Sequence, residues 1–440
     1  MNHVFWMSLG GRGANIGMIA TLPDLHGFSG ERGMDPVRNV VLVTIDALRQ
    51  DMLATYGHRG GLSPFIDSIA DSCVVFERTQ ATGPYTQASF PGILTSSHYF
   101  DHGRSTHLSQ QRTLISEPLR KAGIVTAAFH SNPYLSEYFG WNREWDVFRD
   151  FMDVDVSDTV PFLKGDDINR HASDWLSSHV GKRGYKSFFL WVHYMDVHEP
   201  YVPRRNYLKM VHPSVELSED EMFRLFKDVL LKRNVSDKQR VDLLRKLYEA
   251  RVREVDDHVK QLFGMLEQLE VLQDCIVIMT SDHGDEFGEH GGLSHDGKMY
   301  QELLAVPLLI FDPERKRKEI CSKLVSSIDI SPTIISLLGL DPVKNFQGQP
   351  LLPAGDYEEE GCFGEAVEKL GHKTNERDKE VYYYMEGDLK IIYRGNTDAW
   401  EIYNLRDDPD ESNNLIGATP ESEQIARMRA VLKQRIGRWK

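Results

Sequence analysis

Aspartate and histidine gather in one stretch of the chain, SDHGDEFGEHGGLSHDGK, residues 281–298. The stretch holds five carboxylates and three imidazoles, and its glycines allow the backbone to pass close to a ligand. Carboxylate and imidazole together suit Zn²⁺ or Mn²⁺, whereas an all-oxygen set would favour Ca²⁺ or Mg²⁺. A solvated acidic loop would not require Asp282 and His283 to follow directly on an apolar run. We therefore predict a divalent-metal site that includes Asp282 and His283.

Two other apolar runs are followed by the same residue types. Asp46 comes directly after VVLVTI, and Asp196 and His198 come after FFLWVHY. One aspartate after a strand is more often a turn residue or a helix cap. Ligands in open α/β sheets, however, bind beyond the carboxyl ends of the strands. Three runs that end alike therefore predict that metal-type ligands meet at one edge of a sheet.

Thr86 precedes a short helix-like stretch in GPYTQASFPGILTSS, residues 83–97. A hydroxyl at a helix N-terminus lies beside free N–H groups and the positive end of the helix dipole, which favour a bound anion. A neighbouring metal would lower the pKa of that hydroxyl and make it a nucleophile. Taken alone, a threonine at such a place is more often an ordinary helix cap.

The elements that would carry these residues alternate between strand-length apolar runs and helical stretches, as in an α/β protein. The runs are continuously hydrophobic, which predicts a large, mostly parallel sheet with helices on both faces. The clearest runs are 40–45, 124–129, 188–194, 276–280 and 306–311.

Two later regions complete the predicted organisation. Residues 216–270 are helical, with apolar positions three and four apart. The alternating runs EVYYYMEGDLKIIYRG and AWEIYNL predict antiparallel strands in a small C-terminal α+β subdomain. We therefore divide the chain into an N-terminal extension (1–37), a catalytic domain (38–355) and the C-terminal subdomain (356–440).

The composition excludes several classes of protein. Asp and Glu number 66 against 51 Lys and Arg, and the formal net charge of -15 disfavours a nucleic-acid partner. The four cysteines form no CxxC pair, which indicates core thiols in a reducing compartment. No apolar run approaches the roughly 18 residues that span a bilayer. We expect a cytoplasmic protein without an integral membrane segment.

Four motifs resemble those of the sulfatase-like branch of the alkaline phosphatase superfamily, and they extend over about residues 39–415. IDALRQDMLATYGHRGGLSPFID resembles the opening motif, which implies Asp46 as a metal ligand, with Arg49 and Asp51 as structural partners. EIYNLRDDPDESNNL is similar to the C-terminal motif. The resemblance implies an alkaline-phosphatase-like fold.

The other two motifs carry the remaining site residues. TSDHGDEFGEH followed by GKMYQELLAVPLLIF implies Asp282 and His283 as metal ligands and Lys298 as a contact to the anionic oxygens of an ester. VHYMDVHEPY implies that His198 contacts the substrate or protonates the leaving group.

The chain departs from true sulfatases at the nucleophile. Those enzymes carry Cys or Ser within C/S-x-P-x-R, which is oxidised to formylglycine, but TQASF stands here at residues 86–90. Threonine cannot become formylglycine, Phe90 replaces the arginine, and Ala47 replaces a second acidic ligand. The pattern instead resembles threonine-dependent relatives such as nucleotide pyrophosphatase/phosphodiesterases and phosphoethanolamine or lipoteichoic-acid transferases. The matching residues are Asp46, Thr86, Asp282 and His283.

The resemblance implies a metal-dependent hydrolase of sulfate or phosphate esters in which Thr86 attacks the central atom, with a small-molecule or glycan ester as its partner. Lys298 would stabilise the charge that develops, and His198 would protonate the departing oxygen. A group transferase of surface-glycan or envelope biosynthesis and a catalytically silent glycan-binding protein are the alternatives.

Four further residues are candidates for the same site. A second metal would draw on Asp196 and His295 together with His198. Asn132 and His130, in FHSNPYL, follow the second apolar run and are placed to line the pocket, although an asparagine there also turns the chain.

Overall fold

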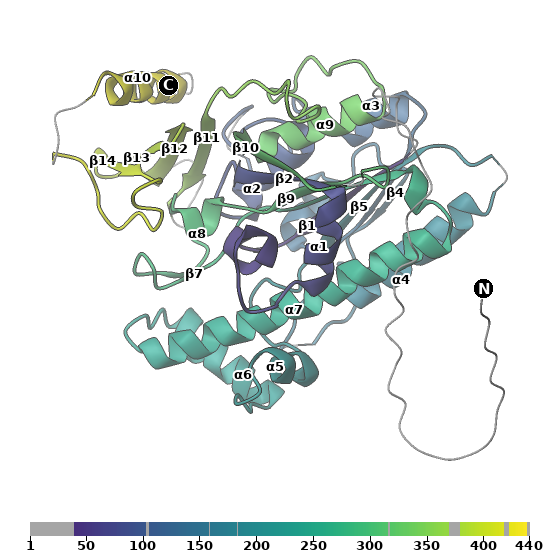
Figure 1. Cartoon of the computed structure of the whole chain (residues 1–440), viewed down its shortest axis with the longest axis horizontal. Coiled ribbons are helices and arrows are strands. Elements are labelled where there is room, and N and C mark those ends of the chain that lie inside the picture. The colour runs from purple at the N-terminus through teal and green to yellow at the C-terminus, as the bar shows by residue number, and fades with distance from the viewer. Residues whose placement is uncertain are drawn as a thin grey trace, which may run out of the picture. The chain divides into compact units, whose positions relative to one another are not determined.

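A large sheet carries the predicted strand ends at its centre (Figure 1). The computed structural model describes residues 39–102, 105–157, 159–182, 184–315, 317–368, 379–417 and 422–437. From one edge to the other, the eight strands are β10 (Glu319–Ser326), β2 (Cys73–Gln80), β9 (Leu308–Phe311), β6 (Cys275–Ser281), β1 (Asn39–Ile45), β5 (Phe188–Tyr194), β3 (Val125–Phe129) and β4 (Val147–Arg149). β9 pairs antiparallel with β2 and β6, and the other described pairs are parallel. The predicted, mostly parallel sheet is therefore confirmed.

The central strands are apolar throughout because both faces of the sheet are covered. All residues of β1 are buried, and successive side chains alternate between two separate cores. Val41 and Val43 pack into one core, whereas Val40 and Leu42 pack into the other. The strands also end level, since Ile45 pairs with Tyr194 of β5 on one side and with Ser281 of β6 on the other.

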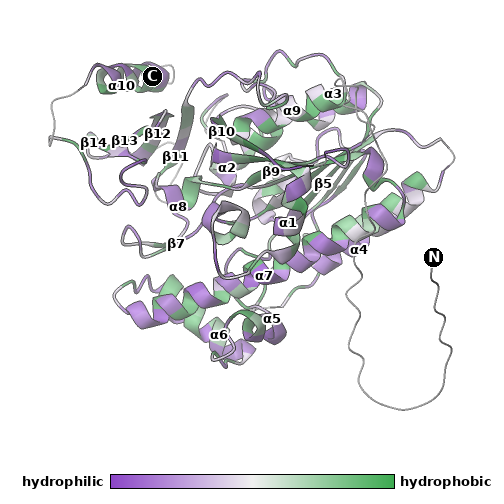
Figure 2. Cartoon of the chain, viewed as in Figure 1, coloured by the Kyte–Doolittle hydropathy of each residue, from purple (hydrophilic) through white to green (hydrophobic). Residues whose placement is uncertain are grey.

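Helices form a layer on each face (Figure 1). One layer contains α1 (Pro64–Ile69), α4 (Gly165–Val180) and the long α7 (Lys238–Gln268). The other contains α2 (Thr86–Thr95), α3 (Ser116–Lys121) and α9 (Ile330–Leu337). Figure 2 shows that α7 carries both hydrophobic and hydrophilic residues along its length. Its outer residues contact α5 (Arg205–Val211) and α6 (Glu219–Phe226).

A second, smaller sheet follows in the C-terminal part of the chain. Its antiparallel strands lie in sequence order: β11 (Cys362–Val367), β12 (Glu380–Glu386), β13 (Leu389–Arg394) and β14 (Ala399–Asn404). α10 (Glu423–Gly437) contacts β12 and β13. One core joins Tyr85 and Phe100 of the larger part to Phe363 and Tyr382 of the small sheet, and the two sheets belong to one compact unit.

Short elements near the strand ends complete the site region. β7 (Glu286–Phe287) and β8 (Leu293–Ser294) form a small hairpin, and α8 (Gln301–Leu304) follows it. The predicted N-terminal extension, residues 1–37, lies outside the described residues. Among the described helices, none combines the length and the apolar character that crossing a bilayer requires.

Candidate active site

Asp46, Asp282 and His283 meet at the carboxyl ends of β1 and β6. All three side chains are fully buried. One atom of each, Asp46 Oδ1, Asp282 Oδ2 and His283 Nε2, contributes to a group whose members lie within 4.8 Å of one another. His283 Nε2 is 3.5 Å from Asp46 Oδ1 and 3.4 Å from Asp282 Oδ2. The level strand ends thus bring the predicted ligands together.

The same three atoms have no hydrogen-bond partner among the described residues. Other atoms of these side chains do: Asp282 Oδ1 accepts hydrogen bonds from the backbone N–H groups of Ala47 and His283, at 3.2 and 3.0 Å. His283 Nδ1 donates to the Gly284 carbonyl at 2.9 Å, which leaves the Nε2 lone pair facing the carboxylates. Unpaired buried polar atoms are rare in proteins. Two carboxylate oxygens and one imidazole nitrogen fit a divalent cation, which would satisfy all three.

The two carboxylates differ in their pKa values. Burial raises the pKa of Asp282, and the neighbouring Asp46 carboxylate raises it further. Burial acts on Asp46 in the same direction, but the imidazoles of His198, His193 and His283 outweigh it and hold the pKa of Asp46 low. The pKa of Asp46 therefore lies below that of Asp282, so Asp46 is the first of the two carboxyl groups to lose its proton as the pH rises.

Asn132 and His193 orient the Asp46 carboxylate. Asn132 Nδ2 donates to Asp46 Oδ2 at 2.8 Å, and His193 Nε2 lies 3.1 Å from the same oxygen. Thr44 Oγ1, 2.9 Å from His193 Nδ1, holds the other side of that ring. Sequence analysis named Asn132 as a pocket residue but missed His193. A polar residue inside the apolar run FFLWVHY was the available signal.

Thr86 stands beside this group. Its side chain is buried, and it is the first residue of α2, whose N-cap is Tyr85. The hydroxyl is therefore not the helix cap that the isolated motif suggested. Asn132 Nδ2, which contacts Asp46, also lies 3.5 Å from Thr86 Oγ1. One amide group thus connects the hydroxyl to the metal-type ligands.

His198 and His295 line the same region. The His295 ring lies 4.5 Å from the His283 ring and 4.9 Å from the His198 ring, measured between centroids. His295 Nδ1 is 2.7 Å from Asp285 Oδ1, and Tyr201 donates to the second oxygen of Asp285. Burial alone would lower the pKa of His295, but Asp285 outweighs it and raises that pKa to about 10.

The predicted second metal set of Asp196, His198 and His295 is not among the groups of possible ligands that lie within 4.8 Å of one another in the described residues. The Asp196 side chain lies instead in a buried cluster with residues of α7. Its Oδ1 is 3.4 Å from Arg251 Nη2 and 3.4 Å from His258 Nε2. The Arg251 guanidinium already supplies the positive charge that this carboxylate needs.

The cationic side chains that the motifs carry are paired with carboxylates. Lys298 Nζ lies 2.7 Å from Glu286 Oε2 and donates to the His290 carbonyl at 2.9 Å. Arg49 is bound by Asp51 and Glu289 at 2.7 and 2.6 Å. The predicted contact of Lys298 with ester oxygens would therefore compete with Glu286.

Phe90, at the place of the sulfatase arginine, is fully buried. Its ring centroid is 5.1 Å from that of His193 and 5.7 Å from that of Trp191. Trp141 packs on the same ring at 6.4 Å. The side chain therefore belongs to the core behind the site and offers no charge to a substrate.

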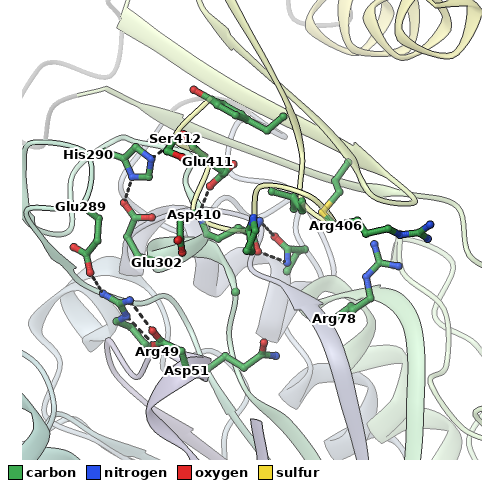
Figure 3. Close-up of a pocket in the computed structure, with 18 of the residues that line it drawn as sticks. Arg49, Asp51, Arg78, Glu289, His290, Glu302, Arg406, Asp410, Glu411 and Ser412 are labelled. Atoms are coloured by element: carbon green, nitrogen blue, oxygen red, sulfur yellow. Dashed lines mark hydrogen bonds and ion pairs between the residues drawn. The ribbon is translucent and has the colours of Figure 1, made fainter. Parts of the chain in front are cut away.

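A cavity of about 1050 Å³ lies apart from this site (Figure 3). Its lining comes from the opening motif, the hairpin region and the C-terminal motif, and includes Arg49, Asp51, Glu289, His290 and Glu411. The residues Asp46, Thr86, Asp282 and His283 do not line it. In Figure 3, several of its charged side chains are joined to one another, as in the contacts of Arg49 with Asp51 and Glu289. Arg49 of the opening motif therefore pairs with Glu289 of the hairpin region, and this contact joins two segments of the chain that are far apart in the sequence.

Comparison with known proteins places the chain in a family. A family model described as Sulfatase matches residues 38–340, and a second, described as N-sulphoglucosamine sulphohydrolase, C-terminal, matches residues 288–438. The chain belongs to the sulfatase family. An arylsulfatase of Clostridium perfringens is 24% identical over 456 residues, which cover 90% of this chain and 93% of that protein.

Solved structures share the sulfatase fold. BT4656 in complex with its substrate D-glucosamine-2-N,6-O-disulfate has a TM-score of 0.75 and 18% identity, and the match covers 92% of this chain and 98% of that one. A phosphonate monoester hydrolase of Agrobacterium radiobacter has a TM-score of 0.68 and 19% identity, with 92% and 95% covered. Two predictions are thereby confirmed: the alkaline-phosphatase-like fold, and the assignment of the chain as an ester hydrolase of the sulfatase family. Enzymes of this family use a divalent metal.

Proposed function

We propose that the chain is a metal-dependent hydrolase of sulfate esters in which Thr86 is the nucleophile. The observation that carries this proposal is the Asn132 amide, 2.8 Å from Asp46 Oδ2 and 3.5 Å from Thr86 Oγ1. The amide joins a buried hydroxyl to Asp46, whose other oxygen, Oδ1, is one of three ligand atoms that lack a partner among the described residues. Asp46, Asp282 and His283 would hold the cation, which when bound supplies positive charge that favours the ionised hydroxyl and the ester oxygens.

The residues of the chain then have separate tasks. Thr86 Oγ1 gives its proton to solvent water and attacks the sulfur, and the bond from sulfur to the alcohol oxygen breaks as the new bond forms. His198 gives a proton to the departing alcohol. Water then attacks the sulfur of the threonine ester, which releases sulfate and restores the hydroxyl. Asn132 holds the hydroxyl in place through both steps.

The charges of the site favour an ester that carries a single negative charge. Lys298 and Arg49 are neutralised by carboxylates, and Phe90 supplies no charge. A sulfate monoester, a phosphodiester or a phosphonate monoester carries one negative charge, whereas a phosphate monoester carries about two near pH 7. We expect turnover to be fastest with sulfate esters and slowest with phosphate monoesters of the same alcohol. A panel of these four ester classes, assayed with several divalent metals, checks this order.

Thr86→Ala tests the nucleophile. The variant should lose at least about a thousandfold in kcat, because alanine has no hydroxyl that could attack the sulfur. Thr86→Ser keeps the hydroxyl and should retain measurable activity, and both variants should keep the metal content and thermal stability of the parent. Full activity in Thr86→Ala would refute the assignment. Addition of acceptor alcohols separates hydrolysis from transfer, since a transferase would divert product from free sulfate.

A further inference from the structure

A second cavity lies at the edge of the large sheet opposite the candidate active site. Its volume is about 590 Å³, and its lining includes Val125, the first residue of β3, and Lys186, which comes shortly before β5. β1, β3 and β5 run parallel, so their amino ends lie at the edge away from Asp46. The seven residues of β5 span about 20 Å. A ligand in this cavity would therefore bind separately from the ester.

Three aromatic side chains line this cavity: Trp175 and His179 near the end of α4, and Tyr185 in the segment that follows it. All three are half-buried. The Trp175 and His179 rings are stacked 5.3 Å apart with an interplanar angle of 8°, and the Trp175 ring also packs on Phe188 of β5 at 5.8 Å. His179 Nε2 lies 2.9 Å from the Lys186 carbonyl oxygen. The protein itself therefore holds these rings in place.

The cationic groups of the cavity are two lysines, Lys182 and Lys186. Both are exposed, and neither pairs with a carboxylate of a described residue, whereas Lys298 is held by Glu286. No described aspartate or glutamate lines the cavity, and residues 175–188 of the sequence contain none. The positive charge here contrasts with the formal net charge of -15 of the whole chain. Both ammonium groups are thus available for an anion.

The lining residues favour a ligand with two parts. Stacking of a nucleic-acid base on an aromatic side chain raises affinity roughly tenfold or more, so the rings favour a planar group. Two ammonium groups match a phosphate monoester, which carries about two negative charges near pH 7. The Ser178 hydroxyl, also in the lining, can donate to a phosphate oxygen. The volume lies within the range of about 300–1,000 Å³ that is usual for small-molecule sites.

We propose that this cavity binds a planar heteroaromatic ring that carries a phosphate group, the chemistry of a nucleoside monophosphate. The ring stacks beside Trp175, and the phosphate pairs with Lys182 and Lys186. This site goes beyond the proposed function, because the residues that would cleave the ester lie at the other edge of the sheet and take no part in it. The bound ligand connects the end of α4 to the segment that leads into β5, so it should raise Tm.

Calorimetry with adenosine monophosphate tests the proposal in Thr86→Ala, so that no ester is consumed at the candidate active site. Adenosine and ribose 5-phosphate should each bind at least about tenfold more weakly, since each lacks one of the two parts. Adding Lys182→Gln and Lys186→Gln together should weaken adenosine monophosphate about tenfold, through the loss of two exposed ion pairs. Lys209→Gln removes an exposed lysine on α5 and is the matched control, which should keep the starting affinity.

Trp175→Leu tests the aromatic part of the site. Leucine keeps an apolar side chain against Phe188 but removes the stacking surface, so adenosine monophosphate should bind about tenfold more weakly and ribose 5-phosphate equally well. Thermal unfolding without ligand shows whether this variant folds, and the lysine variants, at exposed positions, decide the proposal if it does not. Absence of binding by adenosine monophosphate would overturn the proposal. So would an unchanged affinity in the double lysine variant or in folded Trp175→Leu, or equal affinities for adenosine and adenosine monophosphate.

Discussion

At the scale of single residues, Asn132 connects the Thr86 hydroxyl, our proposed nucleophile, to the carboxylate of Asp46. Asn132→Ala removes the hydrogen bond to the Asp46 carboxylate and the contact with Thr86. A hydrogen bond to a charged group is worth about 1.5–3 kcal/mol, so we expect kcat to fall roughly 10- to 100-fold with little change in KM. Steady-state kinetics on a sulfate ester measure this split.

Two further variants sharpen the test of Asn132. Asn132→Asp replaces a donor by a carboxylate beside Asp46 and should reduce kcat more than Asn132→Ala does. Ser131→Ala changes the neighbouring buried residue, which bonds to Leu163 and not to the site, and should retain activity. If kcat is unchanged in Asn132→Ala, the positioning role is wrong.

The ligand group makes a separate prediction about bound metal. His283→Ala and Asp282→Asn each remove a ligand atom that lacks any other described partner, so each should release most of the metal measured by elemental analysis. His179→Ala is the control, since that imidazole on α4 contacts the Lys186 carbonyl at 2.9 Å and none of the ligand residues, and it should leave the metal in place. Parental stoichiometry in both ligand variants would exclude this site.

The sequence predicted some site residues and missed others for a physical reason. Asp46, Asp282 and His283 come directly after central parallel strands, so their meeting follows from the position of those strands in the sheet. Asp196 also follows such a strand, but its partner Arg251 lies 55 residues further along the chain. Contacts at that separation depend on the packing of α7, which strand patterns do not report.

At the scale of elements, the buried pair of Glu411 and Lys390 joins the small sheet to the larger part. Glu411 Oε1 lies 2.8 Å from Lys390 Nζ of β13, and Glu411 Oε2 accepts the Gln301 N–H of α8 at 2.6 Å. Glu411→Gln would leave a lysine buried without a charge partner. Such a loss costs about 3–5 kcal/mol, so the free energy of unfolding and Tm should both fall clearly.

An exposed pair in the same region provides the control for Glu411. Glu386 pairs with Arg427, which is 59% exposed, and surface pairs contribute about 0–1 kcal/mol. Chemical denaturation of Glu386→Gln should therefore give a free energy of unfolding close to that of the parent. A similar loss in the two variants would show that burial of the pair is not what stabilises the junction.

The central strands of the sheet could be predicted from the sequence, whereas strands at its side could not. The runs that became β1, β5 and β6 are apolar throughout because helices cover both faces. β2 and β10 were not among the clear runs, since they lie at one side of the sheet and carry exposed or half-buried residues such as Glu77 and Glu319. The pattern that identified the central strands does not apply where one face meets solvent.

At the scale of the whole molecule, Glu365 makes stability depend on pH. This β11 residue is fully buried where the small sheet meets the larger part, and its Oε1 accepts the Phe100 N–H at 2.6 Å. Burial raises its pKa to about 8, with Asp101 adding to the rise and Arg435 and Arg112 opposing it. Between about pH 4.5 and pH 8 the folded protein keeps a proton that the unfolded chain has lost. Stability from this group is therefore present at low pH and falls as the pH rises.

Glu365→Gln should remove that part of the pH dependence. The amide keeps the size and the acceptor oxygen but needs no proton, so Tm at pH 8 should rise by roughly 1 °C per kcal/mol recovered, with little change at pH 5. Thermal unfolding at several pH values measures the slope of Tm against pH for Glu365→Gln and for the parent. Glu319→Gln, a change at an exposed position, should leave the slope of the parent unaltered. Identical slopes in Glu365→Gln and the parent would contradict the assignment.

The burial of Phe90 also bears on how this chain can evolve. Its ring lies among Trp141, Trp191 and His193, so an arginine there would place an unpaired charge in an aromatic core at a cost of several kcal/mol. A formylglycine-type motif would need an arginine in place of Phe90 and changes in these neighbours, in addition to a change at Thr86. Of these, the change at Phe90 carries the cost to the core, so the packing around this ring opposes single substitutions toward that motif.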